Sequence, residues 1–188
     1  MIANKDRSGF IGASDSGYVM RRWDTKTFEN WWREKQGFVQ NNICTNAMKA
    51  GTAWEHKILD ALNIPGLKKD VQIIKGRLRV NYDGLAPFEV IEVKTHSADK
   101  PFKVTADYRR QVNVEMYQAG MRKARIAAYA LLPDDYKNYF REVDPERLTF
   151  HPIEYDGSFI ERYVPRKDYL CMCLETGRFP KESEVVYE

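Results

Sequence analysis

Sulfur and imidazole ligands are scarce in this sequence, and their scarcity excludes several classes of site. The chain has three cysteines and three histidines, whereas a four-cysteine zinc or iron–sulfur site needs more thiolates than that. Cys44, Cys171 and Cys173 are three in number and cannot all pair, and Cys171 and Cys173 are too close in sequence for an ordinary disulfide. We therefore expect reduced thiols, which are usual in a cytosolic protein.

Long apolar runs and a strong excess of one charge are also missing. No segment is apolar over the length that spans a bilayer, and the opening residues MIANKDRSGF lack the apolar stretch of an export signal. We therefore expect a cytoplasmic protein without a membrane partner. The net charge of +3 excludes a strongly basic nucleic-acid coat but allows a basic groove beside an acidic site.

The 188 residues favour a single domain, 1–188, because no repeat, low-complexity tract or linker divides them. Helices are predicted from a cap at Ser14 or Asp15 to about Arg22, over 25–35, from an Asn46 cap to Leu62, and over about 105–122 and 158–175. Strands are predicted at 71–74, 78–82, 88–95, 126–132 and 148–153. This order predicts an α/β fold of the α+β kind, with a mixed central sheet flanked by helices.

Two short stretches in the strand block indicate an acidic centre. Glu92 and Lys94 are two residues apart on a predicted strand, so their side chains point to the same face while Ile91 points into apolar packing. Asp83 ends the preceding strand, where Gly84 would permit a bend. If the two strands are neighbours, Asp83 meets Glu92 across the pair.

Two carboxylates at that separation repel each other unless one takes up a proton or a cation lies between them. Magnesium is the natural cation because it prefers hard oxygen ligands, with manganese as a substitute. Asp83, Glu92 and the main-chain carbonyl of Val93 would hold the ion, and Lys94 would orient the attacking water and steady negative charge. The competing interpretation is a surface salt bridge between Glu92 and Lys94.

Two helical positions add to this pattern. Gly51 and Glu55 are four residues apart, so they share a helix face on which glycine lets another backbone or DNA come close. Glu55 would support the metal, directly or through water. Gln111 lies early in the helix after Lys94 and would hold a phosphate oxygen or the nucleophilic water. Taken alone, each of these two residue types is more often a solvated residue on a helix surface.

These residues together resemble the phage lambda exonuclease group, also called YqaJ-like viral recombinase nucleases, of the PD-(D/E)xK superfamily. The resemblance rests on Gly51…Glu55, Asp83-Gly84, Glu92-Val93-Lys94 and Gln111…Tyr117, and it covers about residues 7–132. It implies a restriction-endonuclease-like core. The segment Arg7-Ser8-Gly9-Phe10-Ile11-Gly12-Ala13-Ser14-Asp15 is similar to one in which the family binds a terminal 5′-phosphate through arginine and serine. Arg7 and Ser14 are the matching residues, and both offer donors that suit a phosphate.

The resemblance implies a magnesium-dependent 5′→3′ exonuclease acting on double-stranded DNA ends in phage or prophage recombination, inside a bacterial host. It also implies a homotrimeric ring and a phage single-strand annealing protein as partner. Two alternatives stay open. One is an endonuclease of the restriction or junction-resolving type, and the other is a non-catalytic DNA-binding recombination accessory protein.

Further DNA contacts are expected from basic and aromatic side chains. Some of the basic residues would touch phosphates, although most charge runs are solvated faces; they are Arg21, Arg22, Lys68, Lys69, Lys75, Arg77, Arg79, Arg109 and Arg110. Tyr18, Trp23, Trp31 and Trp32 could stack on unpaired bases, but aromatics at helical spacing are more often core residues.

Overall fold

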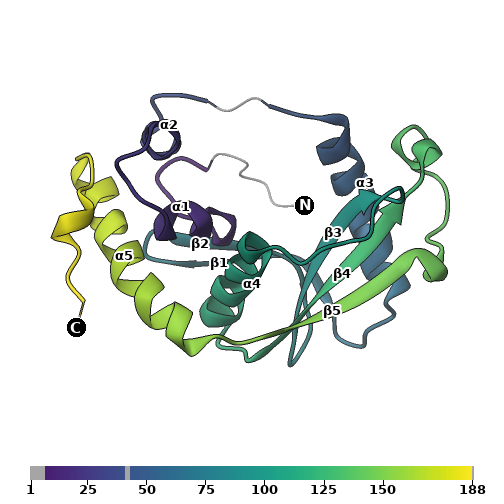
Figure 1. Ribbon diagram of the computed structural model, residues 1–188. Helices are drawn as coiled ribbons and strands as arrows, with labels where there is room; N and C mark the ends of the chain where they lie inside the picture. The colour runs from purple at the N-terminus through teal and green to yellow at the C-terminus, as the bar shows by residue number, and fades with distance from the viewer. Residues whose placement is uncertain (1–6, 41–42, 188) are drawn as a thin grey trace.

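A computed structural model describes residues 7–40 and 43–187 as a five-stranded sheet with helices on both faces (Figure 1). The helices are α1 (Ser16–Met20), α2 (Lys26–Lys35), α3 (Asn46–Ala61), α4 (Ala106–Ala119) and α5 (Gly157–Thr176). The strands are β1 (Lys68–Lys75), β2 (Leu78–Leu85), β3 (Val90–Ser97), β4 (Lys123–Leu131) and β5 (Leu148–Glu154). Short 3₁₀ turns are η1 (Ala13–Asp15), η2 (Pro133–Tyr136), η3 (Pro145–Arg147) and η4 (Glu182–Glu184).

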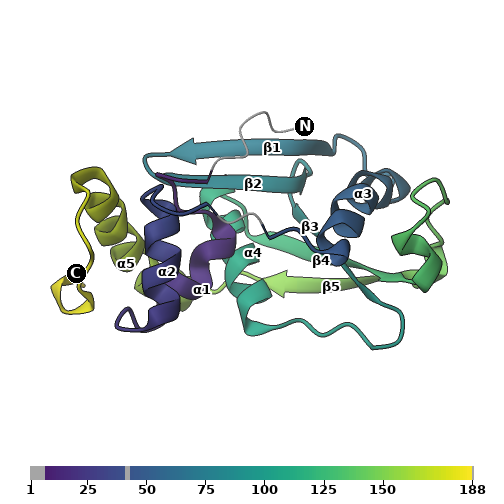
Figure 2. The ribbon, with the colours of Figure 1, turned by 90° about the horizontal axis from the view of Figure 1, so that it is seen from above.

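The sheet is mixed, as the sequence predicted. Its strands lie in the order β1-β2-β3-β4-β5, and β3 pairs with β4 in parallel while the other three pairs are antiparallel (Figure 2). The parallel pair requires a crossover, and α4 supplies it. The ladder between β2 and β3 pairs Leu85 with Val90 and Gly84 with Ile91. It ends there, immediately before Asp83 and Glu92.

Side-chain oxygens begin the long helices. Thr25, Thr45, Thr105 and Asp156 each accept the backbone N–H three residues ahead, which satisfies a donor that the first helical turn leaves without a partner. The predicted Asn46 cap is wrong by one residue, since Thr45 fills that position. Asp15 occupies the N-cap position of α1, as one of the two predicted residues, but its side chain makes no hydrogen bond to the helix and instead accepts the N–H of Gly12, at 2.7 Å.

Two apolar clusters hold the layers together. On one face α3 packs Trp54 and Ile58 against β3 and β4, where it meets Ile91. On the other face α1, α2, α4 and α5 share the second cluster, where α1 near the start of the chain packs against α5 near its end (Figure 1). The three tryptophans of that face, Trp23, Trp31 and Trp32, are buried. They are core residues, so the idea that they stack on bases is wrong.

Gly84 has a different role from the predicted bend, because β2 runs straight through it to Leu85. A Cβ atom at this position would lie 2.9 Å from Leu59 Cδ2 and 3.1 Å from Leu67 Cδ1. Glycine is therefore required because α3 and the loop after it approach the strand closely. This packing places α3, and with it Glu55, beside the ends of β2 and β3.

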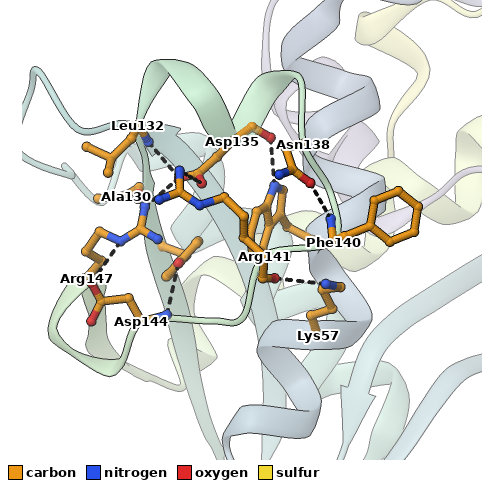
Figure 3. Close-up of polar contacts among 11 residues, drawn as sticks. Lys57, Ala130, Leu132, Asp135, Asn138, Phe140, Arg141, Asp144 and Arg147 are labelled. Atoms are coloured by element: carbon orange, nitrogen blue, oxygen red, sulfur yellow. Dashed lines mark hydrogen bonds and ion pairs between the residues drawn. The ribbon is translucent and has the colours of Figure 1, made fainter.

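The connection between β4 and β5 is organised by a buried ion-pair network outside the pocket (Figure 3). Asp135 is fully buried and accepts from Arg147 Nη1 at 2.5 Å, Arg141 Nη1 at 3.3 Å and Leu132 N at 2.8 Å. Its main-chain oxygen accepts the indole N–H of Trp54, which ties the connection to α3. No helix in the described part of the chain is long and apolar enough to cross a membrane.

Candidate active site

A pocket of about 270 Å³ opens where β2 and β3 separate from each other, beside α3, α4 and the N-terminal segment. Alternate residues of β2, namely Arg79, Asn81 and Asp83, line one wall. The other residues that line it are Arg7, Phe10, Gly12, Ala13, Ser14, Asp15, Lys35, Glu55, Glu92, Val93, Lys94, Gln111 and Glu115. Most of these side chains are polar or charged, so the pocket suits a charged ligand.

The two strands separate at the pocket because a side chain replaces a backbone acceptor. Asp83 Oδ2 accepts the N–H of Val93 at 2.8 Å, a donor that a continued β2–β3 ladder would have satisfied. Glu92 directly follows Ile91, the last residue of β3 that pairs with β2, and Asp83 directly precedes its partner Gly84. The fork therefore brings both carboxylates to the same opening, as predicted.

Glu92 is nearly fully buried and is held by two donors. Lys94 Nζ donates to Glu92 Oε1 at 2.5 Å, and Gln111 Nε2 donates to the same oxygen at 2.6 Å. Gln111 Nε2 also donates to Glu115 Oε1 at 2.9 Å, while its own oxygen lies 3.4 Å from Lys94 Nζ. The ammonium also lies 5.0 Å from the centre of the Tyr108 ring. Strand β3 and helix α4 thus join their polar residues into one network.

The acids of the pocket perturb one another. Burial, followed by the charges of Glu92 and Glu55, raises the pKa of Asp83 well above its usual value. Burial and the charge of Glu92 raise the pKa of Glu115 in the same way and that of Glu55 to a smaller extent. Burial lowers the pKa of Lys94, but Glu92, Asp83 and Glu115 together outweigh it and raise the pKa. The acids therefore favour protons or another cation, and the amine stays charged.

Glu55 lies on α3 at the border of a second cavity. That cavity, of about 240 Å³, shares Glu55, Val93 and Lys94 with the first and continues past Gly51 and Thr95. A Cβ atom on Gly51 would make an ordinary contact with Thr95 Oγ1 at 3.4 Å. The absence of a side chain at Gly51 therefore leaves space in the second cavity. It is not required by close packing of α3 against β3.

Glu55 also belongs to a potential metal-ligand group with His56 and Asp70, whose ligand atoms lie within 4.8 Å of one another. Among the described residues, it is the one group of at least three potential ligands whose atoms all lie within that distance. The ligand atoms of Glu55, Asp83 and Glu92 share a pocket but are therefore further apart than 4.8 Å as a set of three. His56 Nε2 lies 3.0 Å from Asp70 Oδ2. Glu92 turns its Oε1 towards Lys94 and Gln111 instead.

The end of the pocket away from α3 carries the residues predicted to bind phosphate. Arg7 and Ser14 both line it, and both side chains are exposed enough to meet a ligand. Lys35, at the end of α2, is 2% exposed and pairs with Asp15 Oδ2 at 2.6 Å. Asp15 Oδ1 in turn accepts the indole N–H of Trp31. Buried contacts thus fix the wall that presents Ser14.

The sequence-predicted residues gather in this one pocket: Arg7, Ser14, Glu55, Asp83, Glu92, Val93, Lys94 and Gln111. Sequence reasoning missed Lys35, Asn81 and Glu115. The spacing of Gln111 and Glu115, one helical turn apart, was a signal for the last of these. Of the nine basic residues named for DNA contact only Arg79 lines the pocket, and several others pair with nearby acids, as Arg21 does with Asp107 at 2.9 Å.

The donor set fits a hard divalent cation. Carboxylates and a main-chain carbonyl are the oxygen ligands that magnesium and manganese take, and Asp83, Glu92 and Val93 provide them at the fork. The raised pKa values of Asp83 and Glu55 are those of carboxylates that a nearby cation would stabilise in the charged form. Cysteine does not take part, since Cys44, Cys171 and Cys173 are free thiols outside the pocket.

No family model matches the sequence, and no curated protein sequence matches it. Solved structures do. An alkaline exonuclease, LHK-Exo from Laribacter hongkongensis, has a TM-score of 0.68 at 21% identity, with 91% of this chain and 90% of that chain covered. Its complex with dAMP has a TM-score of 0.66 at 21% identity, with the same shares covered. A phage-related exonuclease from Haemophilus somnus 129PT has a TM-score of 0.58 at 15% identity, with 89% of this chain and 94% of that chain covered. The chain therefore has the fold of these exonucleases, and its mixed sheet flanked by helices agrees with the α+β fold that the sequence predicted.

Proposed function

We propose that the chain is a metal-dependent deoxyribonuclease of the YqaJ-like viral recombinase group, hydrolysing DNA phosphodiesters 5′→3′ from double-stranded ends. One observation carries the proposal: a single pocket joins the acids and amine of a nuclease centre to the Arg7 and Ser14 wall. The fold shared with LHK-Exo and the phage-related exonuclease supports it. The single domain 1–188 would act in phage or prophage recombination, in the bacterial cytoplasm.

In this proposal Asp83, Glu92 and the Val93 carbonyl would hold magnesium, with Glu55 in support. A bound ion would lower the pKa of water and offset charge on the phosphate. Lys94 keeps its proton because neighbouring acids raise its pKa, so it would act as a fixed cation that orients the attacking water and stabilises charge on the phosphate oxygens. Gln111 would position the same water or a phosphate oxygen through its amide.

Arg7 and Ser14 favour an enzyme that acts at chain ends. A guanidinium and a hydroxyl beside the acidic centre suit a terminal 5′-phosphate, which carries more charge than an internal phosphodiester. The structure of LHK-Exo in complex with dAMP supports this assignment, because a deoxynucleoside monophosphate is what such cleavage would release. The second cavity beyond Glu55 would take the continuing strand.

Linear and covalently closed circular duplexes test the proposal, each incubated with magnesium, with manganese and with a chelator. We expect the metal-dependent release of nucleotides from the linear DNA and an intact circle. Nicking of the circle would favour the endonuclease alternative. No cleavage of either DNA, with no heat of magnesium binding in calorimetry, would favour the non-catalytic alternative.

We also propose the assembly that the family resemblance implies, a homotrimeric ring that works with a phage single-strand annealing protein. Mass measurement by light scattering tests the ring, with a particle three times the chain mass of 22.0 kDa expected. A monomer in the presence of DNA would argue against it.

A further inference from the structure

Helix α4 carries an acid, Glu115, that lines the pocket. Glu115 lies one turn after Gln111, and its side chain is fully buried against the pocket. Its Oε1 accepts from Gln111 Nε2 at 2.9 Å, and its Oε2 has no hydrogen-bond partner among the described residues. Tyr82 donates to the main-chain oxygen of Glu115, a contact that any residue at this position would provide.

Packing alone does not account for a glutamate here. A methionine or glutamine would fill the same volume without a buried carboxylate, and a buried polar atom without a partner destabilises a folded protein. The site also places Glu115 near Glu92 and Asp83, which makes its negative charge less favourable still. Such a residue needs a role beyond filling space.

The hydrogen bonds of Gln111 indicate that role. Its Nε2 has two hydrogens, and they go to Glu92 Oε1 at 2.6 Å and to Glu115 Oε1 at 2.9 Å. The opposite amide orientation would direct the carbonyl oxygen at two carboxylate oxygens, so the pair of acids selects one orientation. In that orientation Gln111 Oε1 faces Lys94 Nζ, at 3.4 Å.

We propose that Glu115 is a positioning residue that acts through Gln111: it fixes the amide so that Gln111 holds both Glu92 and Lys94 in the arrangement needed for phosphodiester hydrolysis. This inference rests on the proposed nuclease function. Without Glu115, one hydrogen of Gln111 loses its acceptor and the amide is free to turn. Lys94 then loses a fixed acceptor and Glu92 a fixed donor.

Steady-state cleavage of a linear duplex tests the inference with Glu115→Gln, Glu115→Met, Gln111→Ala and the double variant Glu115→Met/Gln111→Ala. We expect Glu115→Met to lower kcat about 10- to 100-fold, the range for partners that orient reactive groups, with KM within about threefold. Glu115→Gln keeps an acceptor for Gln111 and should stay within about fivefold of wild type. The double variant should be within about twofold of Gln111→Ala, because both changes remove the same function.

Asn113→Ala is the matched control, because Asn113 is also a buried polar residue of α4, with 4% of its surface exposed. Its side chain bonds to the main chain of Asp156 and Arg109 and does not line the pocket. It should lower stability and leave kcat unchanged. A wild-type kcat in Glu115→Met, or fully additive effects in the double variant, would overturn the inference. The proposed function would still stand in that case, provided that the wild-type protein cleaves DNA. A folded wild type that does not cleave DNA with either metal would overturn both.

Discussion

Two fully buried acids, Asp135 and Glu115, are stabilised in opposite ways. Asp135 accepts from two arginines and a backbone N–H, at 2.5, 3.3 and 2.8 Å (Figure 3). Glu115 accepts from one amide on one oxygen, at 2.9 Å, and its other oxygen has no partner in the described segments. Burial is the same in the two places, so burial alone does not distinguish a structural acid from an active one.

The difference lies in how charge is balanced. Around Asp135, Arg147 and Arg141 supply more positive charge than the carboxylate needs, and the network holds the β4–β5 connection on α3. In the pocket, Glu55, Asp83 and Glu115 lie near Glu92, and all of them depend on the charge of Lys94. The saturated acid stabilises a loop, whereas the acids of the pocket outnumber the one amine that they share, so a further cation among them would be favourable.

Replacing Glu92 or Lys94 in the pocket should have the largest effect on the rate of DNA cleavage. Glu92→Gln keeps the shape of the side chain but removes a charge that would bind the metal, and Lys94→Ala removes the fixed cation. We expect each to lower the rate of DNA cleavage by about 10³-fold, with the Kd for duplex DNA changed little. Single-turnover cleavage and fluorescence anisotropy measure the two quantities.

Glu89→Gln is the control for that prediction, because Glu89 pairs with Arg125 at 2.8 Å and does not line the pocket. Its cleavage rate should remain at the wild-type level. Near-wild-type cleavage by both Glu92→Gln and Lys94→Ala would show that the metal-centred reading of the pocket is wrong.

Removing the saturated acid should instead affect stability. Asp135→Asn leaves Arg147 without its main counter-charge, and breaking a buried ion pair costs about 3 kcal/mol at the lower end of the usual range. The lower end applies because Arg147 also donates to Asp144 and to the Ala130 carbonyl. Urea unfolding measures the change, and cleavage per folded molecule should not change.

Asp134→Asn tests whether that loss belongs to the buried network. Asp134 is the exposed neighbour in the same 3₁₀ turn, and surface changes of this kind usually alter the free energy of unfolding by less than about 0.5 kcal/mol. Equal losses in Asp134→Asn and Asp135→Asn would contradict the comparison.

The parts of the site that follow from local geometry could be predicted from the sequence. Strand alternation places Glu92 and Lys94 on one face of β3, and the short interval to Asp83 makes β2 its neighbour. The mixed sheet follows in the same way, from the order of helices and strands. These features depend on residues that are close in the chain.

The missed residues depend on contacts between distant segments. Lys35 is the last residue of an amphipathic helix, where an ordinary surface lysine is common, and only the packing of α2 against η1 buries it against Asp15. Gly84 looks like a turn residue, but the position of Leu59 on α3 decides its role. The network around Asp135 likewise joins residues that no local pattern connects. Tertiary packing overrides local preference in each case.

The phosphate wall offers a smaller effect. Arg7→Ala and Ser14→Ala should each reduce the preference for a 5′-phosphorylated over a 5′-hydroxyl duplex about tenfold, since a charge-assisted hydrogen bond contributes roughly 1.5–3 kcal/mol. Arg22→Ala is the control, because Arg22 pairs with Asp24 on the surface and lies outside the pocket. Rates on matched duplexes with the two kinds of end give the preference. A wild type that digests both ends equally would remove the role assigned to Arg7 and Ser14.

The smallest effect is the contribution of Glu115 to the pH dependence of stability, beside the contributions of Asp83 and Glu55, whose pKa values are also raised. Burial and the charge of Glu92 raise the pKa of Glu115 above its ordinary value of 4.5. Between 4.5 and that raised value the folded chain holds a proton that the unfolded chain has released, so the free energy of unfolding falls as pH rises through this window. Glu115→Gln removes the contribution of Glu115 and leaves those of Asp83 and Glu55, so the variant should gain stability relative to wild type as pH rises from 4.5.

Urea midpoints of wild type and Glu115→Gln, measured from pH 4 to 8 without divalent metal, give that difference directly. A difference that stays constant across the range would mean that Glu115 titrates alike in the folded and unfolded chains, and the contrast with Asp135 would then lie in geometry alone.

Adding magnesium at neutral pH should raise the wild-type urea midpoint, because a cation in the pocket favours the charged acids of the folded state. The same addition to Asp83→Asn should raise its midpoint less, since that variant lacks a predicted ligand of the ion.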